Sequence, residues 1–241
     1  MTFERDVLPG NVIEGSIPIF NAGNEVASVK VSLADYLYNA SGETFYSNPG
    51  SHLRSNAPWT HLSTELLKIP PCSQVNFYYK IVVPCDSLLQ GTYWGLILIE
   101  PIDEVVNQGS KEEQSLDVQT VVRYGFQLIT NIRGSGAYDL KVVSKELVRQ
   151  DAKTLLVIDV LNTGTLVMEP KMHMEVFDLQ GKCIKKAELC KRRIYPTCSV
   201  RYAPDISDLQ PGKYMTLIVF DQGDKALFGT QYTLDIKDSE S

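Results

Sequence analysis

Three histidines are the side chains of this sequence best suited to acid–base chemistry or metal binding: His52, His61 and His173. His52 and His61 lie in a proline- and glycine-rich segment, residues 47–71, with no aspartate or glutamate at metal-ligand spacing beside them. His173 alternates with two methionines, which is the pattern of a strand residue that faces solvent. The sequence therefore favours surface histidines over metal ligands, and it predicts no metal site.

Other catalytic patterns are missing from the sequence. There is no G-x-S-x-G nucleophile elbow, no P-loop and no dinucleotide fingerprint. Asp35, Asp178 and Asp221 come at the ends of expected strands beside turns, where aspartate usually serves turn geometry. A hydrolase assembled from distant residues, or from paired carboxylates, stays open as a third alternative. The residue chemistry indicates a binding protein, not an enzyme, and it calls for no cofactor.

The five cysteines give few constraints. Cys72 and Cys85 bracket a segment that is typical of one strand, which would hold their sulfurs roughly 30 Å apart, far beyond disulfide reach. Cys183, Cys190 and Cys198 are close in sequence, and Cys190–Cys198 is the preferred pair if one forms. The odd count leaves at least one free or intermolecular thiol. No cysteine pair has zinc-site spacing.

Composition limits the classes of protein to which this chain can belong. The chain has 241 residues, 44% hydrophobic and 22% charged, which is typical of a globular protein. Its net charge of -6 and its scattered basic residues argue against nucleic acid as a partner. No apolar run approaches the ~20 residues of a membrane-spanning helix. The first residues do not form a signal peptide, so the protein is either cytosolic or has lost a leader.

Residues 117–132 form the most informative stretch, because its even positions are apolar or β-favouring and most odd positions are polar or small. This period of two predicts a strand with one apolar face. At ~3.3 Å per residue it would extend roughly 50 Å, far longer than an ordinary strand. The polar segment 103–115 precedes it. Two interpretations follow: the strand offers an edge to another polypeptide, or it is an ordinary sandwich strand with a bulge at Gly125.

One plan occurs twice in the chain. Residues 17–43 and 158–182 each contain an alternating strand, an Asn-x-Gly step, a second alternating strand and a glycine-bearing turn. Further on, residues 88–101 and 209–222 each contain a Gly-x-Tyr step that opens a strand. Asparagine and glycine accept the backbone of tight turns, and β-branched and aromatic residues fill strands. Short strands separated by turns at such intervals predict antiparallel sandwiches.

The duplication predicts an all-β chain of two tandem immunoglobulin-like antiparallel β-sandwich domains. The break with the most flexible composition is Gly134-Ser135-Gly136, so the predicted domains are residues 1–133 and residues 138–241.

Four aromatic residues have predicted places in these sandwiches. Trp94 lies in an apolar run and is expected in the core. Trp59 either plugs the end of the first sandwich or lies on a binding surface. Tyr93 and Tyr214 each follow a turn glycine by two residues, so they are expected at equivalent buried positions.

Three features occur together in the first predicted domain: Pro58-Trp59 in a loop, the strand opening Leu67-Lys68-Ile69-Pro70-Pro71, and a long polar segment that runs into an alternating last strand. This combination resembles the periplasmic pilus chaperones of the PapD-like family.

A second resemblance rests on the order of five motifs: Pro58-Trp59, Ile69-Pro70-Pro71, Val82-Val83-Pro84, Gly91-Thr92-Tyr93-Trp94-Gly95 and Val121-Val122-Arg123-Tyr124-Gly125. This order is similar to that of a group of Gram-positive cell-surface proteins with a similar first domain. Both resemblances imply immunoglobulin-like domains outside the cytoplasm, in the periplasm or at the cell surface.

The chaperone resemblance also implies a binding site. In that family the last strand of the first domain supplies alternating side chains to an incomplete subunit, and two basic residues hold the subunit's carboxylate. In this sequence the basic pair would be Arg123 and Arg5. This sequence departs from the family in two places: Gly125 interrupts the donor strand, and residues 130–133 replace the basic-aromatic ending of that strand. The side chains offered to the partner would be those of Val118, Thr120, Val122, Tyr124, Phe126 and Leu128.

Two functions from different classes follow. The first is a chaperone-like protein that lends the edge of residues 117–132 to a pilus or surface subunit, or to a second copy of itself. The second is a cell-surface or wall-associated structural module whose strand only completes its own sheet, because sandwiches of this type share architecture without sharing function. Neither function involves nucleic acid or insertion into a membrane.

Overall fold

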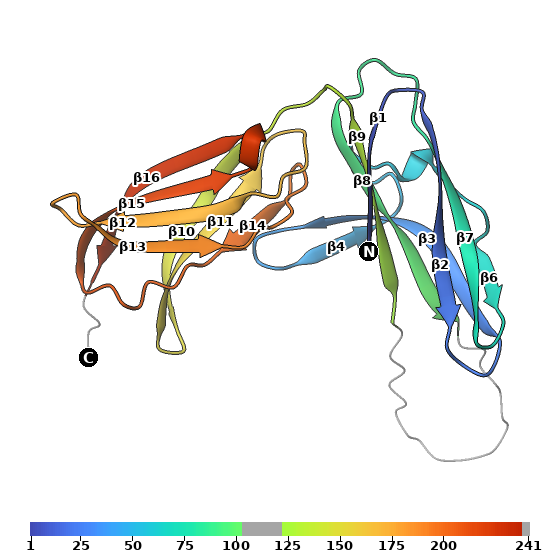
Figure 1. Cartoon of the computed structure of the whole chain (residues 1–241), viewed down its shortest axis with the longest axis horizontal. Helices are drawn as coiled ribbons and strands as arrows, with labels where there is room; N and C mark the ends of the chain where they lie inside the picture. Colours follow the sequence, from blue (N-terminus) through green and yellow to red (C-terminus); the bar gives the residue numbers. More distant parts are fainter. Residues whose placement is uncertain (103–121, 238–241) are drawn as a thin grey trace, which may run out of the picture. The chain divides into compact units, whose positions relative to one another are not determined.

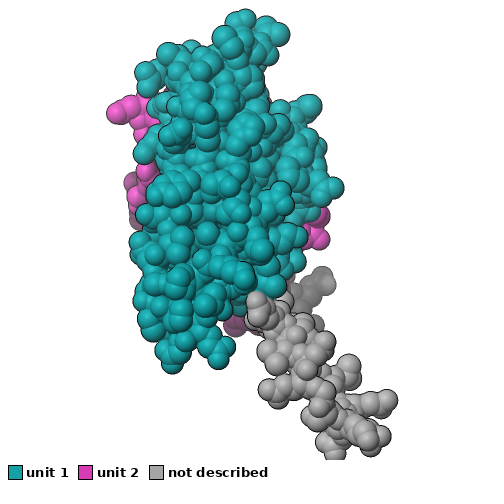
Figure 2. All heavy atoms as spheres, turned by 90° about the vertical axis from the view of Figure 1, so that its right-hand side faces the viewer, with its two compact units in different colours: residues 1–36, 46–134 teal, residues 37–45, 135–241 magenta. Residues whose placement is uncertain are grey.

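The structure is a computed structural model, which describes residues 1–102 and 122–237. It contains two compact units: unit 1 comprises residues 1–36 and 46–134, and unit 2 comprises residues 37–45 and 135–241. Figures 1 and 2 show the strands and the surfaces of these units. Residues 37–45 cluster with unit 2, although they are early in the sequence. The predicted domain limits, 1–133 and 138–241, stay a prediction.

Unit 1 is built on two sheets. The edge-to-edge order of the larger one is β1-β9-β8-β3-β4, with β6 beside β3, and the order of the smaller one is β2-β7-β5. The pairing is antiparallel except between β1 and β9, which run parallel. The first sheet comprises β1 (Thr2–Val7), β9 (Tyr124–Ile132), β8 (Gly91–Ile102), β3 (Ala27–Tyr38), β4 (Thr44–Ser47) and β6 (Leu66–Ile69). The second comprises β2 (Val12–Asn21), β7 (Ser73–Val82) and β5 (Thr60–Leu62).

The core of unit 1 forms from the alternate residues that each sheet turns inward. Within the smaller sheet the ring of Tyr79 on β7 lies over its cross-strand partner Gly15 on β2, where an added Cβ would lie 2.4 Å from the ring. Tyr79 in turn lies edge-on to Phe3 and near Phe126, with ring centroids 5.8 and 6.1 Å away. Among the most buried core residues are Phe77, Ile81, Ile97 and Leu128.

Unit 2 repeats the two-layer plan with antiparallel sheets ordered β10-β11-β14 and β13-β12-β15-β16. Its core contains Ile158, Met172, Ile218 and Phe220, drawn from both sheets. The first sheet comprises β10 (Leu140–Gln150), β11 (Lys153–Asn162) and β14 (Ser199–Tyr202). The second comprises β13 (Cys183–Leu189), β12 (Lys171–Phe177), β15 (Gly212–Asp221) and β16 (Leu227–Ile236). The predicted all-β chain of two sandwiches is thus confirmed; short 3-10 turns at Ala57–Trp59 and Gly223–Lys225 are the helical elements of the described residues.

The duplicated Asn-x-Gly step has the same hydrogen bonds in both units. The side-chain oxygen of Asn21 accepts the N–H of Gly23, and that of Asn162 accepts the N–H of Gly164, both at 2.9 Å. The Asn21 amide donates to the Glu25 and Ile69 carbonyls at 2.7 and 3.0 Å. The matching bonds of Asn162 to Leu166 O and Ile194 O are both 2.8 Å. Each buried amide therefore ties a strand end to a distant segment of its own sandwich.

Other sequence predictions have mixed outcomes. Trp94 is buried as expected, whereas Tyr93 and Tyr214 are only half-buried, so their prediction as buried residues was wrong. Tyr93 lies beside the half-buried Trp59, with ring centroids 4.5 Å apart. All five cysteines are free, which confirms that the first two are unpaired and shows the preferred Cys190–Cys198 bridge to be wrong. Cys198 is buried while Cys190 is exposed.

We expect Asn21→Ala and Asn162→Ala each to lower the free energy of unfolding of its unit by about 2–4 kcal/mol. The change removes several buried hydrogen bonds and leaves carbonyl groups without donors. Urea unfolding of the full chain measures the loss. Asn76→Ala, at an exposed position of β7, is the control and should change stability little; an equal loss in this control would contradict the role of the buried amides.

Candidate functional site

The last strand of unit 1, β9, has neighbours on both sides for most of its length. It pairs antiparallel with β8 from Tyr124 to Ile132 and parallel with β1 from Gln127 to Ile132. The β1 pairing begins where the N–H of Gln127 donates to Met1 O at 3.0 Å. In Figure 1 the start of β9 extends beyond the N-terminal end of β1. The strand therefore completes its own sheet from Gln127 onward.

Before Gln127 the structure describes a neighbour of β9 on the β8 side only. Because the N–H of Gln127 points toward β1, the N–H of Gly125, two residues earlier, points toward the same side. No described strand lies beside Gly125 there. We call residues 122–126, with their outward backbone groups, the β9 edge.

The side chains of the β9 edge continue a row that begins in the core. Leu128 is 1% exposed and Phe126 is 9% exposed, and both belong to the core of unit 1. Tyr124 and Val122, the next members of the row, are 62% and 54% exposed. An apolar row that runs out of its own core into solvent is a surface on which another apolar segment can pack.

The predicted partner-binding residues are thus divided between core and surface. Val118 and Thr120 lie outside the described residues. Phe126 and Leu128 pack in the core of their own sandwich, so in this fold their side chains are not available to a partner. Val122 and Tyr124 alone keep apolar side chains in solvent among the described members of the predicted row.

The two predicted basic residues do not come together. Arg123 forms a two-point ion pair with Glu100 of β8, with Nε–Oε2 and Nη2–Oε1 distances of 3.1 and 3.2 Å. Arg5 pairs in register with Thr130, so it lies about 23 Å along the strand from Arg123 at ~3.3 Å per residue. Its guanidinium lies over the ring of Phe3 at 4.7 Å. One carboxylate of a partner therefore cannot contact both arginines at once. Each arginine is a separate candidate for contact with a partner.

The predicted bulge at Gly125 is wrong. The β8–β9 register runs without a shift from Gly91↔Ile132 to Ile99↔Tyr124, so Gly125 lies in a regular ladder opposite Leu98. A Cβ added there would meet Leu96 and Leu98 side chains at ordinary distances of 3.7 and 3.9 Å. The position therefore accepts a small side chain.

A buried polar cluster around Asp35 lies next to the same sheet, and sequence reasoning missed it. Asp35 lies inside β3, three residues before its end, and its carboxylate is fully buried, so its prediction as a turn aspartate at the end of a strand was wrong. It accepts the N–H groups of Ser51 and His52 at 2.7 and 3.2 Å and the hydroxyl of Ser55 at 2.5 Å. These bonds hold residues 51–55 next to β8, where Ser55 forms a bridge with Trp94. An aspartate inside an alternating strand was the available signal, but its partners lie in a loop that no period reveals.

The cluster lacks the geometry of a nucleophilic triad. The Ser55 hydroxyl bonds to Asp35 directly, and the His52 Nε2 atom is 3.9 Å from the same carboxylate, too far for a hydrogen bond. His52 instead accepts the Arg54 N–H at Nδ1, at 3.2 Å, and its ring lies 4.4 Å from that of Trp94. The cluster is therefore a structural network. The side chain of His52 is only 11% exposed, so its prediction as a surface residue was wrong.

Asn56 connects the segment of residues 47–71 to β9. Its side-chain amide donates to Leu128 O and to Thr130 Oγ1, both at 3.1 Å. The approach requires Gly95 on β8, where an added Cβ would lie 2.8 Å from the Asn56 side-chain oxygen. The paired part of β9 is thereby held from the side of the core, because Thr130 has the same period as the core residues Leu128 and Ile132. No described residue of the segment 47–71 hydrogen-bonds to the β9 edge.

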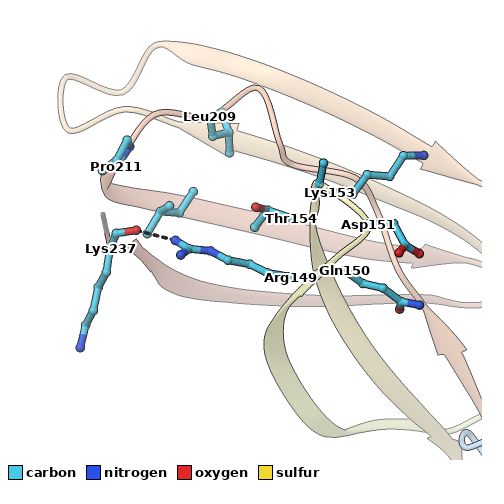
Figure 3. Close-up of a pocket in the computed structure, with 10 residues that line it drawn as sticks. Arg149, Gln150, Asp151, Lys153, Thr154, Leu209, Pro211 and Lys237 are labelled. Carbon is cyan, nitrogen blue, oxygen red and sulfur yellow. Dashed lines mark hydrogen bonds between the residues drawn. The ribbon is translucent and has the colours of Figure 1, made fainter. Parts of the chain in front are cut away.

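A pocket of about 370 Å³ in unit 2 lies between the β10–β11 turn and the end of β16, lined by Arg149, Lys153 and Lys237 (Figure 3). Two of these cationic side chains, those of Arg149 and Lys153, have partners within the protein. Arg149 Nη2 donates to the Lys237 carbonyl at 2.7 Å, and Lys153 lies 3.8 Å from Asp205. Arg149 thereby links β10 to the residue that follows β16.

The sequence matches no protein-family model and no curated protein. Solved structures with a similar chain path include the class 5 fimbriae chaperone CfaA, with 11% identity, TM-score 0.47 and coverage of 98% of this chain and 97% of that one. The Pseudomonas aeruginosa CupB2 chaperone has 8% identity, TM-score 0.41 and coverages of 96% and 97%. The E. coli chaperone DraB has 13% identity, a TM-score of 0.41, and coverage of 98% of this chain and 94% of that one.

No helix among the described residues is long and apolar enough to cross a membrane.

The burial of His52 has a consequence for stability as a function of pH. Burial lowers the pKa of His52 below its ordinary value of 6.5, although the Asp35 carboxylate opposes the shift. The unfolded chain therefore takes up a proton near pH 6.5 that the folded unit does not, and unit 1 loses stability as the pH falls through and below 6.5. Urea unfolding between pH 8 and pH 5.5 measures this loss.

The pH dependence should be smaller in His52→Gln than in the parent protein. His61→Gln removes a histidine at an exposed position of β5 in the same unit and is the control. If the change in free energy of unfolding with pH is the same in His52→Gln as in the parent protein but smaller in His61→Gln, His52 is not the source of the pH dependence.

Proposed function

We propose that this chain is a non-enzymatic, chaperone-like protein that binds another polypeptide by strand addition at the β9 edge. The observation that carries the proposal is the exposure of Val122 and Tyr124, which extend the core row of β9 beyond its pairing with β1. Backbone groups of the partner would pair with the outward groups of Gly125, and alternate apolar side chains of the partner would cover the exposed row.

The chemistry of this edge describes the partner. Strand addition requires an extended segment with unpaired backbone groups, so the partner is a polypeptide that lacks a strand or carries a free one. The resemblance to pilus chaperones suggests a subunit of a surface structure and a location in the periplasm or at the cell surface. Arg123 adds a positive charge beside the edge that Glu100 neutralises in the free protein.

A structural module at the cell surface is the second candidate function. The observation that favours it is the pairing of β9 on both sides from Gln127 to Ile132, which shows that this part of the strand completes its own sheet. The two functions differ in whether the β9 edge is used, and this difference can be tested.

We expect Val122→Glu and Tyr124→Glu to reduce capture of a partner from the native envelope fraction at least about tenfold, because a carboxylate would have to be buried against apolar side chains. Co-purification at equal folded concentration measures the loss. Tyr46→Glu is a matched control, since Tyr46 is a 65% exposed tyrosine on the edge strand β4. Equal capture by all three variants would favour the structural module.

A backbone test separates strand pairing from simple apolar contact. Gly125→Pro removes the outward N–H without taking a hydrogen bond from the β8 ladder, whereas Gly125→Ala keeps that N–H and meets only ordinary contacts. We expect capture to be lost in Gly125→Pro and kept in Gly125→Ala, with both variants folded by circular dichroism. Equal capture by the two variants would show that the backbone of the β9 edge does not pair with the partner.

A further inference from the structure

Unit 2 has an uncovered edge at the place where unit 1 has a covering strand. In unit 1 the last strand, β9, is flanked by β1. In unit 2 the last strand, β16, pairs with β15 along all ten residues and ends its sheet, with no strand described on its other side. The first strand of unit 2, β10, instead pairs with β11 along its whole length.

The other long edge strands of the described chain carry features that prevent strand pairing. Charged residues, proline and bulges are the usual means by which edges avoid unwanted partners. The edge strand β2 contains Glu14 and Pro18. The edge strand β10 has a register shift between Val142 and Ser144 and four charged residues, Lys141, Lys145, Glu146 and Arg149.

The strand β16 lacks these features. Its sequence from Leu227 to Leu234 has no charged residue and no proline, and its register with β15 shows no shift. Its one charged residue is Asp235, next to the last position. A long, regular and uncharged edge is the type that pairs with another strand.

The pairing pattern of β15 and β16 shows which backbone groups are free to pair. The N–H of Gln222 donates to Ala226 O at 3.0 Å, so even-numbered residues of β16 bond to β15. The N–H and C=O groups of the odd-numbered residues therefore point away from the sheet. These residues are Leu227, Gly229, Gln231, Thr233 and Asp235.

The outer face of this sheet is polarised toward the same edge. Ion pairs lie on β12 and β13, where Lys186 contacts Glu175 at 2.6 Å. Next to β16, the outward residues of β15 are the partly exposed Met215, Leu217 and Val219. A strand added to β16 would therefore extend the apolar half of the face, not the charged half.

We propose that β16 pairs antiparallel with β16 of a second copy of this chain, which joins two four-stranded sheets across a two-fold axis at Gln231. In this register Gln231 lies opposite Gln231 of the second copy, Gly229 lies opposite Thr233 of the second copy, and Leu227 lies opposite Asp235 of the second copy. Every outward N–H and C=O of the strand then has a partner. A second copy fits because the strand is self-complementary in this register: its single charge falls at the ends, opposite a leucine, and no like charges meet.

This self-association concerns unit 2 and does not rest on the proposed function of the β9 edge. A contact of two strand edges buries little surface, so we expect a weak dimer with a Kd on the order of 0.1 mM. Sedimentation equilibrium of the full chain over a range of concentrations measures it. A chain that remains monomeric up to about 1 mM overturns the proposal.

Gln231→Lys places two positive charges opposite one another on the axis and should raise the Kd about tenfold or more. Ile184→Lys adds the same charge to an exposed apolar position of β13, the opposite edge of the sheet, and should leave the Kd unchanged. Tyr124→Glu, which changes only the β9 edge, should also leave it unchanged. A dimer that is lost in Tyr124→Glu and kept in Gln231→Lys belongs to the β9 edge, which overturns the proposal for β16.

Amide hydrogen exchange tests the register without any substitution. The N–H groups of Gly229, Gln231 and Thr233 should exchange rapidly in dilute protein and become protected as the concentration rises. Those of Phe228, Thr230 and Tyr232 bond to β15 and should be protected throughout. Dimerisation without new protection at the odd positions overturns the strand-pairing model.

Discussion

One buried asparagine amide in each sandwich is the interaction on which the rest of that sandwich depends. Asn21 and Asn162 each end a strand, accept the N–H of the glycine two residues later, and donate to carbonyl groups of two other segments. A buried amide with such partners fixes one arrangement, because any slip of the strands would leave its polar atoms unpaired. The same hydrogen bonds thus stabilise the equivalent strand end in both two-layer units.

The last strands of the two units solve one problem differently. A final strand leaves a row of backbone groups at the edge of its sheet, and natural proteins cover, charge or use such rows. In unit 1 a parallel strand covers part of β9 and leaves the β9 edge with exposed Val122 and Tyr124. In unit 2 the whole of β16 is left, but with small and polar outward residues at its centre. Apolar recognition therefore suits β9, and backbone recognition suits β16.

Local pattern predicted much of the fold, because strand alternation and Asn-x-Gly turns are properties of neighbouring residues. It predicted two β-sandwiches and the apolar face of β9. It did not predict how far that face is buried, since Phe126 and Tyr124 have the same period and differ only in whether the facing sheet reaches them. The Asp35 cluster and the parallel β1 were missed for a similar reason: their partners lie far apart in sequence.

The Asp35 cluster also determines how unit 1 comes apart. Residues 51–55 form no strand and pair with the described strands only at the Ser55–Trp94 bridge. Loops of this kind usually open locally at low free-energy cost. Here, release of the loop would leave a buried carboxylate without the N–H and O–H groups that it accepts. A buried carboxylate without donors costs free energy, so we expect residues 51–55 to unfold together with the sheet and not before it. A segment that resembles a mobile loop in sequence thus becomes part of the cooperative unfolding unit.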